Sequence, residues 1–312
     1  MNLIKPKFWD YKKPNLIAYI LYPITLFIFF INTLLLKTKK IQFKIKTICI
    51  GNIYIGGTGK TTLAIELSKL LKKKYKIVFI KKNYPSHVDE INLLKKKGPV
   101  IVENDRLKAL KNAERRNFKI ALLDDGLQQK NIKYSLKIVC FNSKEGFGNG
   151  FLLPSGPLRE SPEELKKYDI AFLNGETRNR KLYKKIKSIN NNIIVFEAKY
   201  KPVNLKKLNK KKNYLMFCGI GNPHEFEKTL LKYKFRIKKK IIYPDHYKIL
   251  NDELNKIKEI AKEKNLNIIT TEKDYCRLNK NQKKNINVLK IKLKINNLHK
   301  IRKILDAFNE KN

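Results

Sequence analysis

Residues 47–62, TICIGNIYIGGTGKTT, have the composition of a loop that binds the phosphates of a nucleotide. Glycines without a Cβ let backbone N–H groups turn toward a phosphate. Lys60 can reach the terminal phosphates, Thr61 can hold Mg²⁺, and a helix opening at Thr62 offers its positive N-terminal dipole. The candidate nucleotide-binding residues are Gly56, Gly57, Thr58, Gly59, Lys60, Thr61 and Thr62.

The spacing of this loop departs from the pattern G-x-x-x-x-G-K-[ST], which requires a glycine where this chain has Tyr54. The loop is therefore predicted to be a variant of the GGxGKT kind. The alternative is a glycine-rich turn that caps a helix. The apolar strand before the loop and the segment LAIELSKLL after it favour the nucleotide loop.

Two neighbouring carboxylates follow another apolar run, in ALLDDGLQQ at 121–129. In a nucleotide-binding α/β protein an acid at the end of a buried strand meets Mg²⁺, directly or through water. Asp124 and Asp125, with Thr61, are therefore the candidate metal ligands, and Gly126 permits a sharp exit. By itself, Asp-Asp-Gly would be an ordinary turn.

An arginine lies between a Gly-Pro turn and a predicted helix start, in FLLPSGPLRESPEEL at 151–165. Arg159 could form a forked contact with a phosphate or neutralise charge in a transition state. Taken alone, an arginine in such a place is an ordinary surface charge.

Phosphoryl transfer to a hydroxyl needs a base, and an aspartate oriented by a histidine can serve. VDE at 88–90 and YPDHYK at 243–248 supply candidates, but the residues alone do not pair Asp89 with His246, and His87 lies nearer in sequence. An isolated histidine is commonly a surface residue. TTEKDY at 270–275 follows a strand and resembles a helix cap.

The elements that must position these residues alternate between strands and helices, which predicts a mostly parallel sheet covered by helices. Strands are expected at 46–50, 76–80, 99–102, 119–123, 136–141, 169–173 and 193–197, and helices at 61–73, 105–117 and 161–167. After a linker at 199–212, the expected strands are 213–218, 236–243, 266–271 and 287–293, and the expected helices are 223–233, 250–264 and 296–309.

The predicted fold class is therefore α/β, with a P-loop NTPase-like domain at 41–200 and a smaller α/β domain at 201–312. Residues 1–40 are predicted to hold a membrane-associated helix, because 16–36 is an uncharged apolar run flanked by lysines. Its length suits one membrane-spanning helix, but Pro23 would kink it, so an in-plane anchor stays open. Because ATP is cytosolic, the part of the protein that follows this helix is expected to lie in the cytosol.

The net charge of +43 fits a nucleic acid, an anionic membrane or an acidic substrate, or reflects a bias toward lysine and asparagine. No zinc-finger, leucine-zipper or RNP-like pattern is present, so a membrane surface with compositional bias is favoured and no nucleic-acid partner is expected. Four distant cysteines are expected to be reduced core thiols: Cys49, Cys140, Cys218 and Cys276.

Together the segments resemble those of the tetraacyldisaccharide 4′-kinases, the lipid A 4′-kinases of Gram-negative bacteria. The matching segments occur in the family's order: GNIYIGGTGKT (51–61), DDGLQ (124–128), GNGFLLPSGPLRE (148–160), GIGNP (219–223), PDH (244–246) and TEKD (271–274). The segment KKNYPSHVDEINLL (81–94) is shorter than its counterpart, with Val88 and Ile91 in place of a glycine and a proline.

The resemblance implies a two-domain kinase that uses ATP and Mg²⁺ to phosphorylate the 4′-hydroxyl of a tetraacylated glucosamine disaccharide 1-phosphate, giving lipid IVA. It places the enzyme at the cytoplasmic face of the inner membrane. It also implies that Asp89 is the catalytic base with His246, that Glu90 lies beside the base, and that Arg159 stabilises charge. The main alternative is a membrane-tethered P-loop ATPase of the partitioning or metallochaperone type. Such ATPases carry a lysine where this chain has Ile55.

Overall fold

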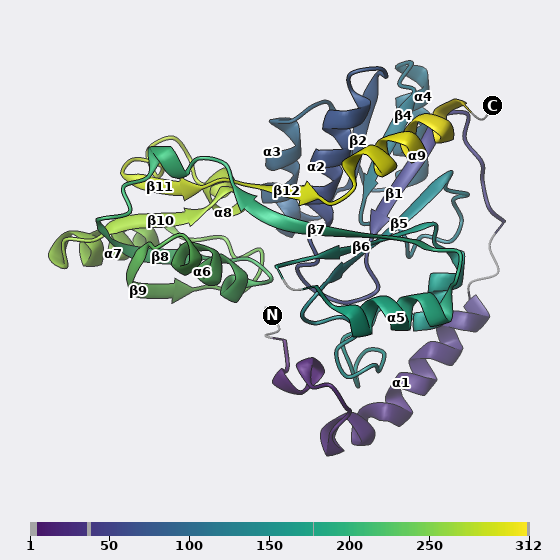
Figure 1. Ribbon diagram of the computed structural model, residues 1–312, viewed down its shortest axis with the longest axis horizontal. Helices are drawn as coiled ribbons and strands as arrows, with labels where there is room; N and C mark the ends of the chain where they lie inside the picture. The colour runs from purple at the N-terminus through teal and green to yellow at the C-terminus, as the bar shows by residue number, and fades with distance from the viewer. Residues whose placement is uncertain (1–4, 36–38, 177, 311–312) are drawn as a thin grey trace.

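The computed structural model describes residues 5–35, 39–176 and 178–310, which form two α/β units (Figure 1). The larger unit contains an eight-stranded sheet whose strands run parallel except for the edge strand β12. In spatial order its strands are β12 (Ile291–Ile295), β7 (Ile194–Pro202), β6 (Ile170–Asn174), β5 (Leu136–Asn142), β1 (Lys46–Gly51), β4 (Ile120–Asp124), β2 (Ile77–Lys82) and β3 (Val100–Glu103). The predicted α/β class and mostly parallel sheet are confirmed.

Helices cover both faces of this sheet because successive strand residues point to opposite sides. In β4, Ala121 and Leu123 belong to the core under α4 and α5, whereas Ile120 and Leu122 belong to the core under α2, α3 and α9. The bounds of these helices are α2 (Lys60–Leu71), α3 (Val88–Lys95), α4 (Arg106–Arg115), α5 (Arg180–Ile189) and α9 (Leu298–Glu310).

The smaller unit is a second parallel sheet with one hydrophobic core on each face. Its strands, in spatial order, are β11 (Ile286–Leu289), β10 (Asn267–Thr271), β8 (Asn213–Cys218) and β9 (Arg236–Ile242). Its helices are α6 (Pro223–Lys232), α7 (Asn251–Glu263) and α8 (Glu272–Arg277). Figure 1 shows this unit beside the larger one, joined to it by β7 and β12.

The C-terminal segment differs from the predicted domain boundary. β12 pairs antiparallel with β7, with Ile291 opposite Pro202, and Ile301 and Leu305 of α9 are buried in the core of the larger unit. The prediction of one C-terminal domain over 201–312 is therefore wrong at its end. The single strand expected at 287–293 is β11 and β12, which belong to different sheets, and β7 extends into the expected linker.

Three short helices, α3, α5 and α8, were not among the expected ones, although TTEKDY was read correctly as a cap. The Thr271 side chain accepts a hydrogen bond from the Asp274 amide at the start of α8. Residues Pro162–Lys167 form a 3₁₀-helix capped by Ser161 rather than an α-helix. All four cysteines are buried and free, as expected.

The N-terminal apolar run forms α1 (Leu16–Leu35), with Pro23 inside it. α1 contacts the larger unit through Phe151, whose ring lies 4.8 Å from that of Tyr22, and through Thr25, whose hydroxyl lies 2.7 Å from that of Ser155. Across the residues that the structure describes, no helix has the length and apolarity needed to cross a membrane.

Candidate active site

The predicted nucleotide loop connects β1 to α2 at the carboxyl edge of the large sheet. Gly56 has a φ of 112° and Gly59, the residue before α2, a φ of 84°, which are conformations that favour glycine. The Lys60 ammonium donates to Asn52 Oδ1 at 3.0 Å and lies 4.0 Å from Asp125 Oδ2. The loop therefore presents a helix N-terminus and a lysine to one space, as phosphate binding requires.

Tyr54, which stands where the strict pattern has glycine, is buried, and its side chain contacts the N-terminal segment. Its hydroxyl donates to Asp10 at 2.5 Å, and its backbone forms a bridge with Leu158. The next residue, Ile55, donates its amide to Pro157 O at 2.8 Å. The Tyr54 side chain thus contacts the N-terminal segment, while the backbone of Tyr54 and Ile55 pairs with the segment that carries Arg159.

The two candidate metal carboxylates have different partners. Asp124 is fully buried, and its Oδ2 accepts the Thr61 hydroxyl at 2.9 Å. Its Oδ1 accepts no hydrogen bond from the described residues. A buried carboxylate oxygen without a partner, next to a hydroxyl at a helix start, fits Mg²⁺, which prefers oxygen ligands and usually completes its shell with substrate phosphates.

Asp125, the second carboxylate, is paired with Arg159 and Lys60, whereas the cation beside Asp124 is Lys81. Arg159 donates from Nη1 to both Asp125 oxygens, at 3.0 and 3.2 Å. Burial raises the pKa of Asp125, but the charges of Lys60 and Arg159 outweigh it and lower the pKa to about 2. Of the two carboxylates, Asp124 is the one that contacts the Thr61 hydroxyl, so Asp124 is the better candidate to share a metal ion with Thr61. Over the described ranges, no group of three or more protein ligands could hold a metal without substrate oxygens.

Arg159 reaches the nucleotide loop from the segment that the sequence singled out. Its Nη1 donates to Asn52 Oδ1 at 2.8 Å, its Nη2 donates to Gln128, and its backbone amide donates to Ile53 O at 2.7 Å. The guanidinium is thus fixed beside the loop rather than exposed as an ordinary surface charge.

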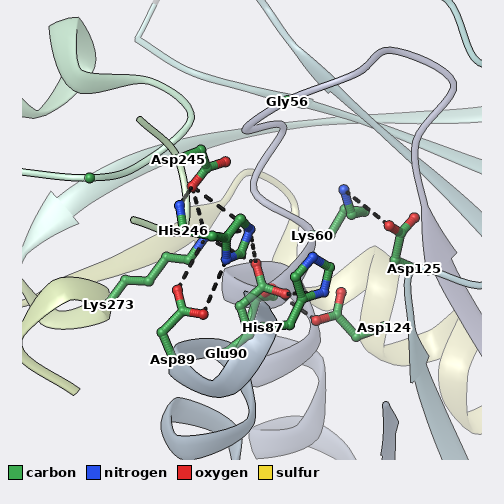
Figure 2. Close-up of polar contacts among 12 residues, drawn as sticks. Gly56, Lys60, His87, Asp89, Glu90, Asp124, Asp125, Asp245, His246 and Lys273 are labelled. Atoms are coloured by element: carbon green, nitrogen blue, oxygen red, sulfur yellow. Dashed lines mark hydrogen bonds and ion pairs between the residues drawn. The ribbon is translucent and has the colours of Figure 1, made fainter. Parts of the chain in front are cut away.

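Asp89 and His246, 157 positions apart in sequence, are in contact across the two units (Figure 2). Asp89 lies in the first turn of α3 and is 1% exposed, and its Oδ1 lies 3.1 Å from His246 Nδ1. Its Oδ2 accepts from Arg277 at 2.7 Å and lies 3.5 Å from Lys273 Nζ. Burial raises the pKa of Asp89, but the hydrogen bond to His246 and the charges of Lys273 and Arg277 hold it well below its usual range.

Glu90 lies beside this pair, as the sequence indicated. Its carboxylate lies 2.5 Å from Lys81 Nζ, 3.2 Å from Lys273 Nζ and 3.8 Å from His246 Nε2. Burial raises its pKa, but the charges of Lys273 and Lys81 outweigh burial and keep Glu90 ionised. His87, the competing histidine, stacks on the ring of His246 at 4.4 Å.

The two units also meet at two glycine-bearing loops. A Cβ placed on Gly221, in the GIGNP segment of the smaller unit, would lie 2.8 Å from the amide nitrogen of Gly57. The same Cβ would lie 2.8 Å from Asp245 Oδ2. This closeness requires glycine at 221 and brings the second unit onto the nucleotide loop, so the site is formed by both units.

Several residues of this arrangement were not assigned a role from the sequence: Asn52, Lys81, Lys273 and Arg277. A signal for two of them was available, because residues four apart share a helix face and Lys273 and Arg277 are so spaced on α8. Lys81 also offered a signal, because it follows the apolar residues IVFI within β2 (IVFIKK), and a charged residue in such a run indicates a partner.

A mostly parallel sheet with a phosphate-binding loop at its carboxyl edge, next to a buried aspartate in contact with a histidine, defines a P-loop phosphotransferase fold. The tetraacyldisaccharide-1-P 4′-kinase family model matches residues 17–310. A Pelagibacter ubique protein called tetraacyldisaccharide 4′-kinase is 45% identical over the full length of both chains, and one from Rickettsia canadensis is 36% identical over 95% of both. The chain belongs to this family and is a kinase.

The fold agrees with that of a solved relative. The crystal structure of LpxK from Aquifex aeolicus, described as an apo form in complex with ATP, aligns with a TM-score of 0.71. It is 21% identical and covers 94% of this chain and 99% of its own. The family model and the 45% identical relative confirm the family predicted from the sequence over the partitioning-ATPase alternative, whereas the roles of individual site residues stay predictions.

Proposed function

We propose that this kinase uses ATP and Mg²⁺ to phosphorylate the 4′-hydroxyl of a tetraacylated glucosamine disaccharide 1-phosphate, giving lipid IVA in lipid A biosynthesis. The observation that carries the proposal is the 3.1 Å contact between Asp89 and His246 beside the nucleotide loop. The names of the family and of its relatives support the acceptor. The ATP described in the Aquifex aeolicus structure supports the donor.

In the proposed reaction, the acceptor oxygen forms a bond to the γ-phosphorus of ATP while the bond to the β–γ bridging oxygen breaks and ADP leaves. The hydroxyl proton passes to the Asp89 carboxylate. Because its pKa is lowered, Asp89 is ionised at neutral pH and orients the hydroxyl before it takes the proton. Such late proton transfer suits a loose transition state. With its Nδ1 protonated, His246 donates to Asp89 and fixes its orientation.

Four further residues complete the proposed phosphate site. Lys60 would contact the terminal phosphates, and Arg159, held by Asn52 beside the loop, would stabilise charge on the transferred group. Thr61 and Asp124 would hold a magnesium ion, which when bound supplies positive charge to the phosphate oxygens.

We also propose that the kinase works at the cytoplasmic face of the inner membrane. α1 leaves apolar side chains uncovered, since Leu16, Ile20 and Phe27 are 74%, 66% and 67% exposed. These three residues share one helix face by their spacing. An apolar helix lying in the interface, with a net charge of +43 on the chain, would hold the kinase where a lipid acceptor resides.

The proposed reaction is tested with the full chain in detergent, ATP, Mg²⁺ and the disaccharide lipid. We expect one phosphate on the 4′-oxygen, shown by mass spectrometry and NMR, and a large loss of product for Asp89→Ala and His246→Ala with ATP binding retained. ATP hydrolysis without a phosphorylated lipid would contradict the proposed acceptor. His224→Ala, at an exposed position on α6, is the control for the histidine.

The proposed location is tested by flotation with vesicles containing an anionic phospholipid. The triple variant Leu16→Ser, Ile20→Ser and Phe27→Ser should lose most of its vesicle binding, while a triple lysine-to-serine variant on α7, at Lys256, Lys258 and Lys262, should keep it. Equal binding by the α1 variant and the wild type would rule out α1 as the anchor.

A further inference from the structure

Lys81 is a buried lysine that the reaction described above does not use. It lies near the end of β2 and is 2% exposed. β2 pairs in parallel with β4, with Ile80 opposite Leu123, so the next residue on each strand, Lys81 and Asp124, come side by side. Burying an ammonium group is unfavourable unless anions compensate it, so its partners indicate its role.

The Lys81 ammonium joins the two halves of the site. Its Nζ donates to Glu90 Oε2 at 2.5 Å and to Asp124 Oδ2 at 2.8 Å. Glu90 belongs to the cluster around Asp89, whereas Asp124 accepts the hydroxyl of Thr61 at the start of α2. A single cation therefore connects the base cluster with the candidate magnesium ligand.

The charge balance at this point depends on Lys81. The Lys81 ammonium lies between the Asp124 and Glu90 carboxylates, and these two anions compensate its charge. Without it, the buried Asp124 carboxylate and the Glu90 carboxylate, which is 14% exposed, would lie near each other with no ammonium group between them. Asp124 Oδ1 still accepts no hydrogen bond among the described residues, so Asp124 can receive a second cation while Lys81 is in place.

We propose that Lys81 is a positioning residue that holds Asp124 and Glu90 together as a cation internal to the protein, before the nucleotide brings its metal ion. The proposal rests on the proposed function in one respect, namely that Asp124 receives Mg²⁺. Lys81 thereby sets the place of the candidate metal ligand Asp124 relative to Glu90, the neighbour of the base, by ion pairs that do not require a divalent ion.

The test measures thermal unfolding of the full chain in Mg²⁺ or EDTA, without ATP or acceptor. In Lys81→Met, Asp124 loses its ammonium partner and Glu90 keeps Lys273, at 3.2 Å. The site should then recruit Mg²⁺, so 10 mM Mg²⁺ should raise Tm by about 3 °C or more. The wild type and Lys69→Met should show no such shift. Lys69 is a matched control, since its ion pair with Glu66 at 2.7 Å is exposed. A Tm of Lys81→Met that does not respond to Mg²⁺ would overturn the proposal.

Two further variants keep the test informative if Lys81→Met does not fold. Lys81→Met combined with Glu90→Gln removes one carboxylate with the ammonium, so the double variant should fold with a higher Tm than the single variant. Lys81→Arg keeps the charge and should restore a Tm that is independent of Mg²⁺. If neither change restores stability, the role of Lys81 is packing and the proposal fails. Because no ATP or lipid is used, this result is separate from the outcome of the kinase assay.

Discussion

The phosphate-binding half of the site and the base half are built in different ways. Lys60, Arg159 and Asp125 all come from the larger unit, and their side chains are 16%, 25% and 22% exposed. In the base half, Asp89 comes from the larger unit while His246 and Arg277 come from the smaller one, and the Asp89 side chain has no exposed surface. The first half can therefore exist in one unit, whereas the second exists only when both units meet.

This difference predicts that the two halves have separate functions, nucleotide binding in the first and positioning of the base in the second. Partly exposed charges on one rigid sheet edge can receive a soluble nucleotide without rearrangement. A fully buried carboxylate held by groups from a second unit depends on the position of that unit, so the base is assembled by domain contact. Changes in the first half should affect nucleotide affinity, and changes in the second should affect turnover and the joining of the units.

The largest expected effect is on turnover in the base half. Asp89→Asn keeps the shape of the side chain but removes the proton acceptor, so kcat should fall by about 10³-fold while the Kd for ATP stays within about twofold. Steady-state kinetics and nucleotide titration measure the two quantities. Asp245→Asn, a more exposed carboxylate next to His246, is the control. If Asp89→Asn lost ATP affinity as well as turnover, the assignment of these two functions to separate halves of the site would be wrong.

In the phosphate-binding half, Lys60→Ala removes the lysine that faces the nucleotide loop. We expect kcat/KM for ATP to fall by about 10²-fold or more, with weaker ATP binding as part of the loss. The contact between Asp89 and His246 should persist, since Lys60 does not touch it. Unchanged kinetics for ATP in Lys60→Ala would count against the assignment of the loop.

Arg277→Met should loosen the junction between the units. The Arg277 side chain is 9% exposed and contacts Asp89 and Asp274, each at 2.7 Å, so its removal leaves two buried carboxylates with fewer partners. Loss of one partner from a buried ion pair costs about 3 kcal/mol of unfolding free energy. Denaturant unfolding should show this loss. In a double-mutant cycle with Asp89→Asn, the two losses should not add; additive losses would show that the contact carries no coupling.

The smallest expected effect is on the pH dependence of stability. The folded-state pKa of Asp89 is lowered, so its stabilising contribution is present above the unfolded-state pKa of about 4 and is lost as pH falls toward the folded-state value. The difference in Tm between the wild type and Asp89→Asn should therefore narrow below about pH 4. Scanning calorimetry from pH 7 to pH 3 measures it, with the exposed Asp252→Asn as control. A constant difference would mean that the Asp89 charge does not join the units.

Much of the larger unit could be predicted because its central strands, such as β4, β5 and β6, are mainly apolar runs and its loop residues have specialised chemistry. The local sequence was sufficient to place Lys60 and Thr61 at the start of α2 and Asp124 at the end of β4. The pairing of Asp89 with His246 could not be derived from local patterns. It depends on how one unit packs against the other, and it entered through the resemblance to a family.

The errors of the sequence-based prediction have a common physical cause. The run at 287–293 is one continuous β-forming segment, and only tertiary pairing assigns β11 to one sheet and β12 to another. Lys273 and Arg277 lie in a six-residue helix whose sequence, EKDYCR, has no apolar periodicity. Their role comes from the carboxylate that they face across the junction.

The return of the chain through β12 has a consequence for how the protein can move. Ile291 pairs with Pro202, and the Val203 amide donates to Lys290 O at 2.9 Å, so the two crossings between the units form the ends of one antiparallel ribbon. The smaller unit is thus, in topology, an enlarged loop of a β-hairpin. A two-stranded ribbon resists twisting more than a single linker does, so opening and closing should follow a bend along one direction. Each closure would then bring the smaller unit back to the same position over the nucleotide loop of the larger unit.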